Sequence, residues 1–148
     1  ILYRCKDKYV PLDKEVELLE NYIVLERVRY GNRVKVSFEK QIDNDVKIAP
    51  LILLNFVENA FKHGVSQEVN KAFVFLFIST SEKEIVFKLK NTKPKSQVKR
   101  LMKDKDNIGM NNTEKQLELL YPNTYSLDIV NTELEYALEL KIQHDGKV

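Results

Sequence analysis

Four polar side chains in one short segment have the types and the spacing needed to hold a charged ligand. The segment Pro50–Gly64 contains Asn55, Asn59, Lys62 and His63, separated by steps of one, three and four residues. These steps place them on neighbouring rows of one face of a helix. Carboxamide oxygens suit Mg²⁺ beside phosphate groups, lysine is a point charge for phosphate, and histidine can hydrogen-bond phosphate or ribose. The segment therefore predicts a site for a metal-bound phosphate compound.

The same segment has the apolar positions that a packed helix requires. The residues expected on the opposite side of this helix are Leu53, Phe56, Val57 and Ala60. Asparagine is a middling helix former, so two asparagines one turn apart indicate a role beyond helix propensity. The pattern also fits a solvated polar face without a ligand, and spacing alone gives the two interpretations about equal weight.

Hydrophobic periodicity predicts the elements that position this helix. The segment Leu12–Tyr30 is expected to be a helix with Glu26 turned outward and Gly31 as its stop. Pro50 is expected to open the ligand-bearing helix and Gly64 to end it. The other predicted elements are the strands Arg33–Gln41, Ala72–Ser79, Glu84–Lys90, Tyr125–Val130 and Glu135–Gln143, a mobile basic loop at Asn91–Asn107 and a helix at Asn111–Leu120.

The order of these elements predicts the fold class. Strands that arrive in adjacent pairs favour a largely antiparallel sheet, so we expect an α+β fold. It should be a two-layer α/β sandwich, with helices on one face of a mixed, mostly antiparallel sheet. Residues 12–148 are expected to form one domain and residues 1–11 a linker from an upstream region. The chain opens at Ile1 without an initiator methionine, so we expect it to be part of a longer protein.

Charge balance and cysteine content argue against several classes of function. Lys and Arg number 24 against 22 Asp and Glu, and a net charge of +2 gives no general reason to expect a nucleic-acid partner or a membrane surface. Cys5 is the single cysteine, so an internal disulfide is excluded and a reducing, cytoplasmic setting is expected. No apolar run approaches the roughly 20 residues that span a bilayer.

Several motifs resemble those of one known family. The segment Asn55–Gly64 resembles the N-box of the GHKL ATPase superfamily, and from Pro50 onward it is most similar to sensor histidine kinases of the LytS/YehU type. Tyr9–Gly31 is similar to the helix that leads into their catalytic domain, and Gly109–Pro122 to their second glycine box and the helix after it. The resemblance covers nearly the whole chain. It implies a catalytic domain with the GHKL (Bergerat) fold that uses ATP and Mg²⁺.

The resemblance also assigns roles to the residues of the N-box. It implies that Asn59 ligates the Mg²⁺ that bridges the ATP phosphates, that Lys62 contacts phosphate, and that His63 holds phosphate or ribose. Asn55 stands where topoisomerase-like relatives carry a glutamate that activates water. Because an amide cannot act as a general base, Asn55 favours phosphotransfer over ATP hydrolysis. We therefore expect Asn55 and Lys62 to be catalytic and to bind the nucleotide.

The two glycine boxes depart from the family pattern. Asn91 stands where the first box has an aspartate that accepts a hydrogen bond from adenine, and losing that charge costs about 1–2 kcal/mol, roughly tenfold in affinity. A plain strand-terminating turn also fits the Asn91 segment. The second box keeps Gly109, with Met110 and Asn112 as further nucleotide contacts, but Gln116 stands where a cation is common.

The expected function is γ-phosphoryl transfer from ATP to a histidine on an upstream dimerisation domain of the same protein. A response regulator is an indirect partner, and the chain is expected to be a cytoplasmic domain of an inner-membrane sensor, bound to the membrane only through other parts of the protein. One alternative is a degenerate module that binds nucleotide weakly or not at all and docks to partner helices. A third hypothesis, a topoisomerase-like or chaperone-like ATPase, is disfavoured by Asn55.

Overall fold

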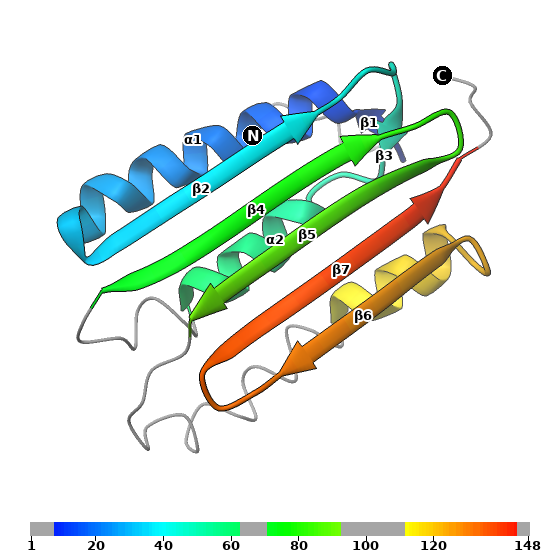
Figure 1. The fold of residues 1–148 in the computed structure, drawn as a ribbon. Helices are drawn as coiled ribbons and strands as arrows, with labels where there is room; N and C mark the ends of the chain where they lie inside the picture. The colour runs from blue at the N-terminus through cyan, green and yellow to red at the C-terminus, as the bar shows by residue number, and fades with distance from the viewer. Residues whose placement is uncertain (1–7, 63–70, 93–111, 145–148) are drawn as a thin grey trace.

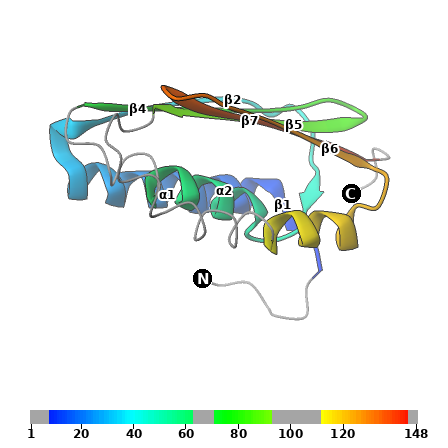
Figure 2. The same ribbon diagram turned by 90° about the horizontal axis from the view of Figure 1, so that it is seen from below.

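The computed structural model of the chain describes residues 8–62, 71–92 and 112–144. These residues form two layers, a five-stranded sheet and a layer of helices that lies against one of its faces (Figures 1 and 2). The helical layer contains α1 (Leu12–Tyr30), α2 (Ile52–Ala60) and a helix over residues 112–120. The predicted α+β sandwich is confirmed.

The sheet is mixed and mostly antiparallel, as predicted. In spatial order its strands are β2 (Val34–Gln41), β4 (Ala72–Thr80), β5 (Glu84–Thr92), β7 (Glu135–Gln143) and β6 (Tyr125–Asn131). β2 and β4 pair in parallel, whereas each other neighbouring pair is antiparallel. The parallel pair is joined through α2, because parallel strands need a crossover connection.

The core lies between the sheet and the helices. Side chains alternate along each strand, so one face of the sheet is buried and the other faces outward. A buried row crosses three strands through Ile78, Phe87 and Leu140, which the strand register places side by side. On the outward face Phe73 and Phe75 are 37% and 49% exposed. The hydrophobic contribution to stability therefore comes mainly from the face that the helices cover.

Helix α1 packs one row of side chains on the sheet. Its buried apolar residues are Leu12, Val16, Leu19 and Ile23. The prediction that Glu26 turns outward is wrong, since Glu26 is 7% exposed and its carboxylate lies 3.9 Å from Arg29. Glu26 is three residues after Ile23 and continues the same helical row, which carries it inward. Gly31 ends the helix at φ 58°, ψ −132°, as its position in the sequence predicts.

Helix α2 begins later than predicted. It starts at Ile52, and the residue before it, Leu51, has the left-handed conformation φ 69°, ψ 0°. A left-handed residue interrupts the right-handed spiral, so Pro50 precedes the helix instead of opening it. The chain remains helical at residues 61 and 62. The predicted stop at Gly64 lies outside the described residues.

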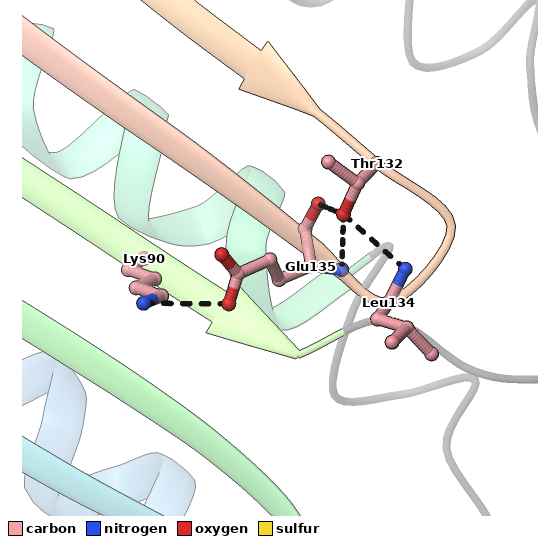
Figure 3. A network of polar contacts seen from close by, with 4 residues as sticks. All are labelled: Lys90, Thr132, Leu134 and Glu135. Atoms are coloured by element: carbon pink, nitrogen blue, oxygen red, sulfur yellow. Dashed lines mark hydrogen bonds and ion pairs between the residues drawn. The ribbon is translucent and has the colours of Figure 1, made fainter.

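Two short structures complete the fold. β1 (Val10–Pro11) pairs antiparallel with β3 (Lys47–Ile48), and Val10 is buried. At the turn between β6 and β7, Oγ1 of Thr132 accepts hydrogen bonds from the backbone N–H groups of Leu134 and Glu135, and Lys90 Nζ lies 3.4 Å from Glu135 (Figure 3).

Within the described ranges, no helix is both long enough and apolar enough to cross a membrane.

Candidate functional site

Helix α2 separates its polar residues from its apolar ones. Its buried side chains are Ile52, Leu53, Phe56, Val57 and Ala60. Asn55 and Asn59 are half-buried on the other side of the helix, and Glu58 and Lys62 are exposed. The structure thus brings Asn55, Asn59 and Lys62 together on one helical face whose back is fixed in the core. His63 lies outside the described residues.

The segment before α2 is held by a residue of α1 and by a residue just after the 112–120 helix. Oε1 of Glu15, on α1, accepts a hydrogen bond from the N–H of Leu51 at 2.7 Å, and Glu15 is 1% exposed. The phenol oxygen of Tyr121, just after the 112–120 helix, accepts one from the N–H of Ala49 at 2.8 Å. Burial raises the pKa of Tyr121 to about 12, and the hydrogen bond from Ala49 works in the opposite direction. Both buried polar groups therefore satisfy backbone amides directly before α2.

The end of α2 is held by aromatic contacts. Phe61 is 1% exposed, and its ring makes an edge contact with Tyr22 at 5.6 Å and a stacked contact with Tyr30 at 6.4 Å between centroids. Burial, together with the charges of Glu26 and Glu58, raises the pKa of Tyr22. Aromatic pairs at such separations stabilise by more than their buried area alone. Helix α2 is thus fixed at both ends against α1.

Asn91 is placed in a strand and not in the predicted basic loop. It is part of β5, where it pairs with Val74 and Tyr136, because the strand continues to Thr92. The rest of the predicted loop, from residue 93 onward, lies outside the described residues. Ile85, Phe87, Leu89 and Asn91 alternate along β5 as buried positions, so Asn91 lies on the helix-covered face. Helix α2 packs against this strand.

The two polar groups of the Asn91 side chain differ in their hydrogen bonding. Its Nδ2 donates to the carbonyl oxygen of Thr92 at 3.1 Å. Its Oδ1 is buried and has no hydrogen-bond partner within the described part of the chain. Buried polar atoms in native proteins almost always have partners. Oδ1 of Asn91, near the end of a strand that packs against α2, is therefore an acceptor with which a ligand donor could pair.

The remaining predicted residues are only partly described. Asn112 is exposed at the start of the 112–120 helix, which lies in the same layer as α2 (Figures 1 and 2). Gly109 and Met110 lie outside the described residues. Among residues 8–62, 71–92 and 112–144, no three His, Cys, Asp or Glu side chains gather where they could hold a metal ion. A divalent cation at α2 would therefore depend on amide oxygens such as that of Asn59 and on oxygens of the ligand.

A separate hollow lies between the 112–120 helix and β6. Its volume is about 360 Å³, and it is lined by Glu114, Glu118, Asn123, Tyr125, Ser126 and Leu127. The hydroxyl of Tyr125 donates to Glu118 at 2.8 Å, and this hydrogen bond is the main reason that the pKa of Tyr125 is raised. Two carboxylates at its wall disfavour an anion such as a phosphate. The hollow contains none of the predicted site residues.

The arrangement of helices and strands is shared with known structures. The catalytic domain of histidine kinase ThkA superposes with a TM-score of 0.63 at 14% identity, covering 91% of this chain and 93% of that domain. The fold is that of a histidine kinase catalytic domain. The histidine kinase domain of the blue-light activated kinase EL346 from Erythrobacter litoralis matches at a TM-score of 0.61 and 15% identity, covering 96% of this chain and 69% of that one.

Sequence relatives agree with this histidine kinase fold. The uncharacterised protein YwpD of Bacillus subtilis is 29% identical over 110 residues, which are 70% of this chain and 40% of YwpD. Sensor protein LytS of Oceanobacillus iheyensis is 28% identical over 82 residues, 53% of this chain and 14% of LytS. Sensor histidine kinase YpdA of Escherichia coli is 26% identical over 123 residues, 78% of this chain and 21% of YpdA.

The chain therefore spans less than half the length of each of these curated relatives. No protein-family model matches it. The resemblance to LytS-type sensor histidine kinases is nevertheless confirmed, because the relatives in sequence include sensor protein LytS and sensor histidine kinase YpdA, and the neighbours in structure are histidine kinase domains.

Sequence reasoning missed two residues that support the site, Glu15 and Tyr121. Glu15 had a detectable signal, because it lies four residues before Leu19 and therefore near the buried row of α1. Tyr121 had none, because its partner Ala49 is 72 residues away in the sequence.

Proposed function

We propose that this chain is the ATP- and Mg²⁺-binding catalytic domain of a two-component sensor histidine kinase. In its reaction the bond from the γ-phosphorus to the bridging oxygen of ATP breaks, and a bond from phosphorus to an imidazole nitrogen forms. The acceptor histidine belongs to a separate dimerisation domain of the same protein. The observation that carries the proposal is the buried acceptor of Asn91 on β5, the strand against which α2 packs, in a fold that histidine kinases share.

Asn91 is suited to recognise adenine. Its Oδ1 can accept a hydrogen bond from the exocyclic amino group of the base. Guanine carries a carbonyl oxygen at the same ring position, and that oxygen would meet the Asn91 acceptor with no proton between them. An empty acceptor of this kind therefore favours ATP over GTP, since an unsatisfied pair of acceptors in a buried site costs free energy.

The polar face of α2 is suited to the phosphates. Asn59 offers an amide oxygen to a divalent metal, and Lys62 offers an ammonium group to phosphate oxygens. Mg²⁺ supplies neutralisation of the charge that develops on the phosphates. Asn55, one turn before Asn59, has no basic group with which to activate water. The face would thus position ATP for transfer and leave its hydrolysis slow.

The partners and the location follow from the proposed function. One structural neighbour is histidine kinase ThkA in complex with the response regulator TrrA. For this chain we propose contact with the dimerisation and phosphoacceptor domain, with a response regulator as the later acceptor. We also place it on the cytoplasmic side, as a domain of an inner-membrane sensor protein.

A second candidate function is a degenerate module that binds nucleotide weakly or not at all and acts by docking. The observation that favours it is the hydrogen bond from Asn91 Nδ2 to the carbonyl oxygen of Thr92. Because this bond uses the amide donor, the side chain has its Oδ1 acceptor left to recognise adenine. An uncharged acceptor also binds the adenine amino group less strongly than a carboxylate.

Titration calorimetry with ADP and with a non-hydrolysable ATP analogue, each with and without Mg²⁺, tests the proposal. We expect binding that Mg²⁺ strengthens and that guanine nucleotides do not reproduce. The absence of both heat and thermal shift at millimolar adenine nucleotide would reject the kinase function in favour of the degenerate module. Steady ATP hydrolysis by the chain would instead favour an ATPase.

Three variants assign the binding to residues. Asn59→Ala should remove the Mg²⁺ dependence of nucleotide binding. Asn91→Ala should weaken adenine nucleotides about tenfold, because it removes the acceptor. Asn32→Ala is the control, because Asn32 is exposed just after the end of α1 and is not part of the α2 face. Equal affinities for all three variants would show that the site lies elsewhere.

A further inference from the structure

Helix α2 has no cap of its own. Leu51, the residue before it, makes no side-chain capping hydrogen bond, and the first turn of α2 contains no acidic residue. The N-terminus of a helix carries unpaired N–H groups and partial positive charge, which an acceptor normally satisfies. The acceptor here comes from another helix, since Oε1 of Glu15 on α1 takes the N–H of Leu51 at 2.7 Å.

The hydrogen bond from Leu51 to Glu15 involves a residue in an unfavourable backbone conformation. Leu51 has φ 69°, a left-handed conformation that is unfavourable for a residue with a β-carbon. Such residues persist where the surrounding structure determines them. Glu15 is almost fully buried, and a buried carboxylate costs free energy unless hydrogen bonds compensate. The hydrogen bond from the Leu51 N–H thus offsets part of the cost of burying the Glu15 carboxylate, and the same bond holds Leu51 in its left-handed conformation.

A short chain of hydrogen bonds leads from this contact to the candidate site. Glu15 accepts from the N–H of Leu51, and the carbonyl oxygen of Leu51 accepts from the N–H of Asn55 at 2.9 Å. Asn55 carries one of the two amides on the polar face, and Asn59 follows one turn later. The contact between Glu15 and Leu51 therefore determines the direction in which the polar face of α2 points.

We propose that Glu15 is a positioning residue for the nucleotide site. By capping α2 from α1 and holding Leu51 left-handed, it fixes the rotation of α2 about its axis and so the positions of Asn55 and Asn59. Glu15 does not touch the nucleotide. The inference rests on the proposed function for its effect on binding, but the effect of Glu15 on the first turn of α2 can be measured without any ligand.

The test compares three single variants. Glu15→Gln keeps an acceptor oxygen, Glu15→Leu removes it, and Leu19→Ala lowers stability from the same buried side of α1 while it leaves the Glu15 acceptor of the Leu51 N–H in place. Amide hydrogen exchange on the ligand-free chain should show the Leu51 and Asn55 amides exchanging at least about tenfold faster in Glu15→Leu than in Leu19→Ala. Equal exchange in these two variants would overturn the proposal.

Nucleotide affinity gives the second readout, measured well below the melting temperature. Glu15→Gln should bind Mg²⁺ and an ATP analogue within about threefold of the unaltered chain, and Glu15→Leu at least about tenfold more weakly, with Leu19→Ala near the unaltered value. Adding Leu51→Gly to Glu15→Leu should recover part of the affinity, because glycine adopts the left-handed conformation without strain. If nucleotide affinity falls in proportion to the free energy of unfolding in every variant, Glu15 has only a structural role and the proposal is overturned.

The two readouts separate the two proposals. If the unaltered chain binds no nucleotide but the Leu51 and Asn55 amides respond to Glu15→Leu as expected, the proposed function fails and the positioning of α2 by Glu15 stands. If nucleotide binds and the amides do not respond, the proposed function stands and the positioning role of Glu15 fails.

Discussion

Tyr121 places a phenol among apolar side chains and uses its oxygen to accept a backbone hydrogen bond. The side chain is 8% exposed, and the N–H of Ala49 donates to it at 2.8 Å. Ionisation of a buried phenol would place a negative charge where water cannot solvate it. The neutral phenol is therefore part of what holds the segment before α2.

The raised pKa of Tyr121 predicts a loss of stability at alkaline pH. The ordinary pKa of 10 applies to the unfolded chain and about 12 to the folded one, so the neutral phenol is favoured by folding. Its contribution is complete below pH 10 and is lost as the pH rises from 10 through about 12. Urea denaturation at a series of pH values should show the free energy of unfolding falling over this window, and falling less steeply in Tyr121→Phe.

The same variant has a separate effect at neutral pH. Tyr121→Phe leaves the buried N–H of Ala49 without an acceptor, which should cost about 1–3 kcal/mol. Tyr125→Phe is the control, because it removes the exposed hydrogen bond to Glu118 and should cost under about 0.5 kcal/mol. An alkaline slope in Tyr121→Phe identical to that of the unaltered chain would contradict the role given to burial.

Single positions of the site differ in how far they could be predicted. The polar face of α2 could be predicted, because steps of three and four residues fix which side chains share a helical face. The burial of Asn91 could not, because it depends on β5 continuing two residues past Lys90. The spacing of Glu15 from Leu19 places it near the buried row of α1, but its hydrogen bond to Leu51 could not be predicted, since carboxylates are rarely buried and Leu51 is 36 residues away.

Among the secondary-structure elements, α1 depends on Gly31 for its end. Gly31 has φ 58° and ψ −132°, and nothing lies within 4 Å of the place that a β-carbon would occupy. Any cost of a side chain there therefore comes from the backbone and not from a clash.

Gly31→Ala should lower the free energy of unfolding by about 1–3 kcal/mol through this backbone strain. Asn32→Ala, at the next residue, should change it by less than about 0.5 kcal/mol. Urea denaturation of the two variants beside the unaltered chain measures the difference. Equal stabilities for Gly31→Ala and Asn32→Ala would mean that the turn can adopt another conformation at no cost.

Long elements could be predicted and short ones could not. α1 and β7 have enough residues for their periodicity to be distinct, and their bounds match the predicted ones. β1 and β3 have two residues each, which is too short for any period. The start of α2 was misplaced because a proline usually opens a helix, whereas the left-handed Leu51 lies between Pro50 and this one.

The two layers of the domain give the sheet one face in the core and one toward solvent. The element order predicted this arrangement, because paired strands with helices between them leave one face of the sheet uncovered. Phe87 on the covered face is fully buried, whereas Phe75 on the other face is 49% exposed. The outer face also has ion pairs, between Lys88 and Glu139 at 3.5 Å and between Lys90 and Glu135 at 3.4 Å.

Substitution of the two phenylalanines measures this asymmetry. Phe87→Ala should cost about 3–5 kcal/mol because it leaves a cavity in the core. Phe75→Ala should cost about 1 kcal/mol, because the side chain is already half in water. Urea denaturation of both variants gives the comparison. Similar costs at the two positions would mean that another layer covers the outer face in solution.

The short pairing of β1 with β3 determines how the domain would respond to tension. Val10 pairs with Ile48, and the N–H of Leu12 donates to the carbonyl oxygen of Val46 at 2.9 Å. A force applied along the chain at Tyr9 would therefore act on α1, which follows β1 directly, on the β1–β3 pair before α2, and, through the hydrogen bond from the Tyr9 hydroxyl, on Leu120 of the 112–120 helix. The five strands of the large sheet lie outside this mechanical path. A pull at Tyr9 would thus be transmitted first to the layer of helices, and to the large sheet only through the packing of these helices on it.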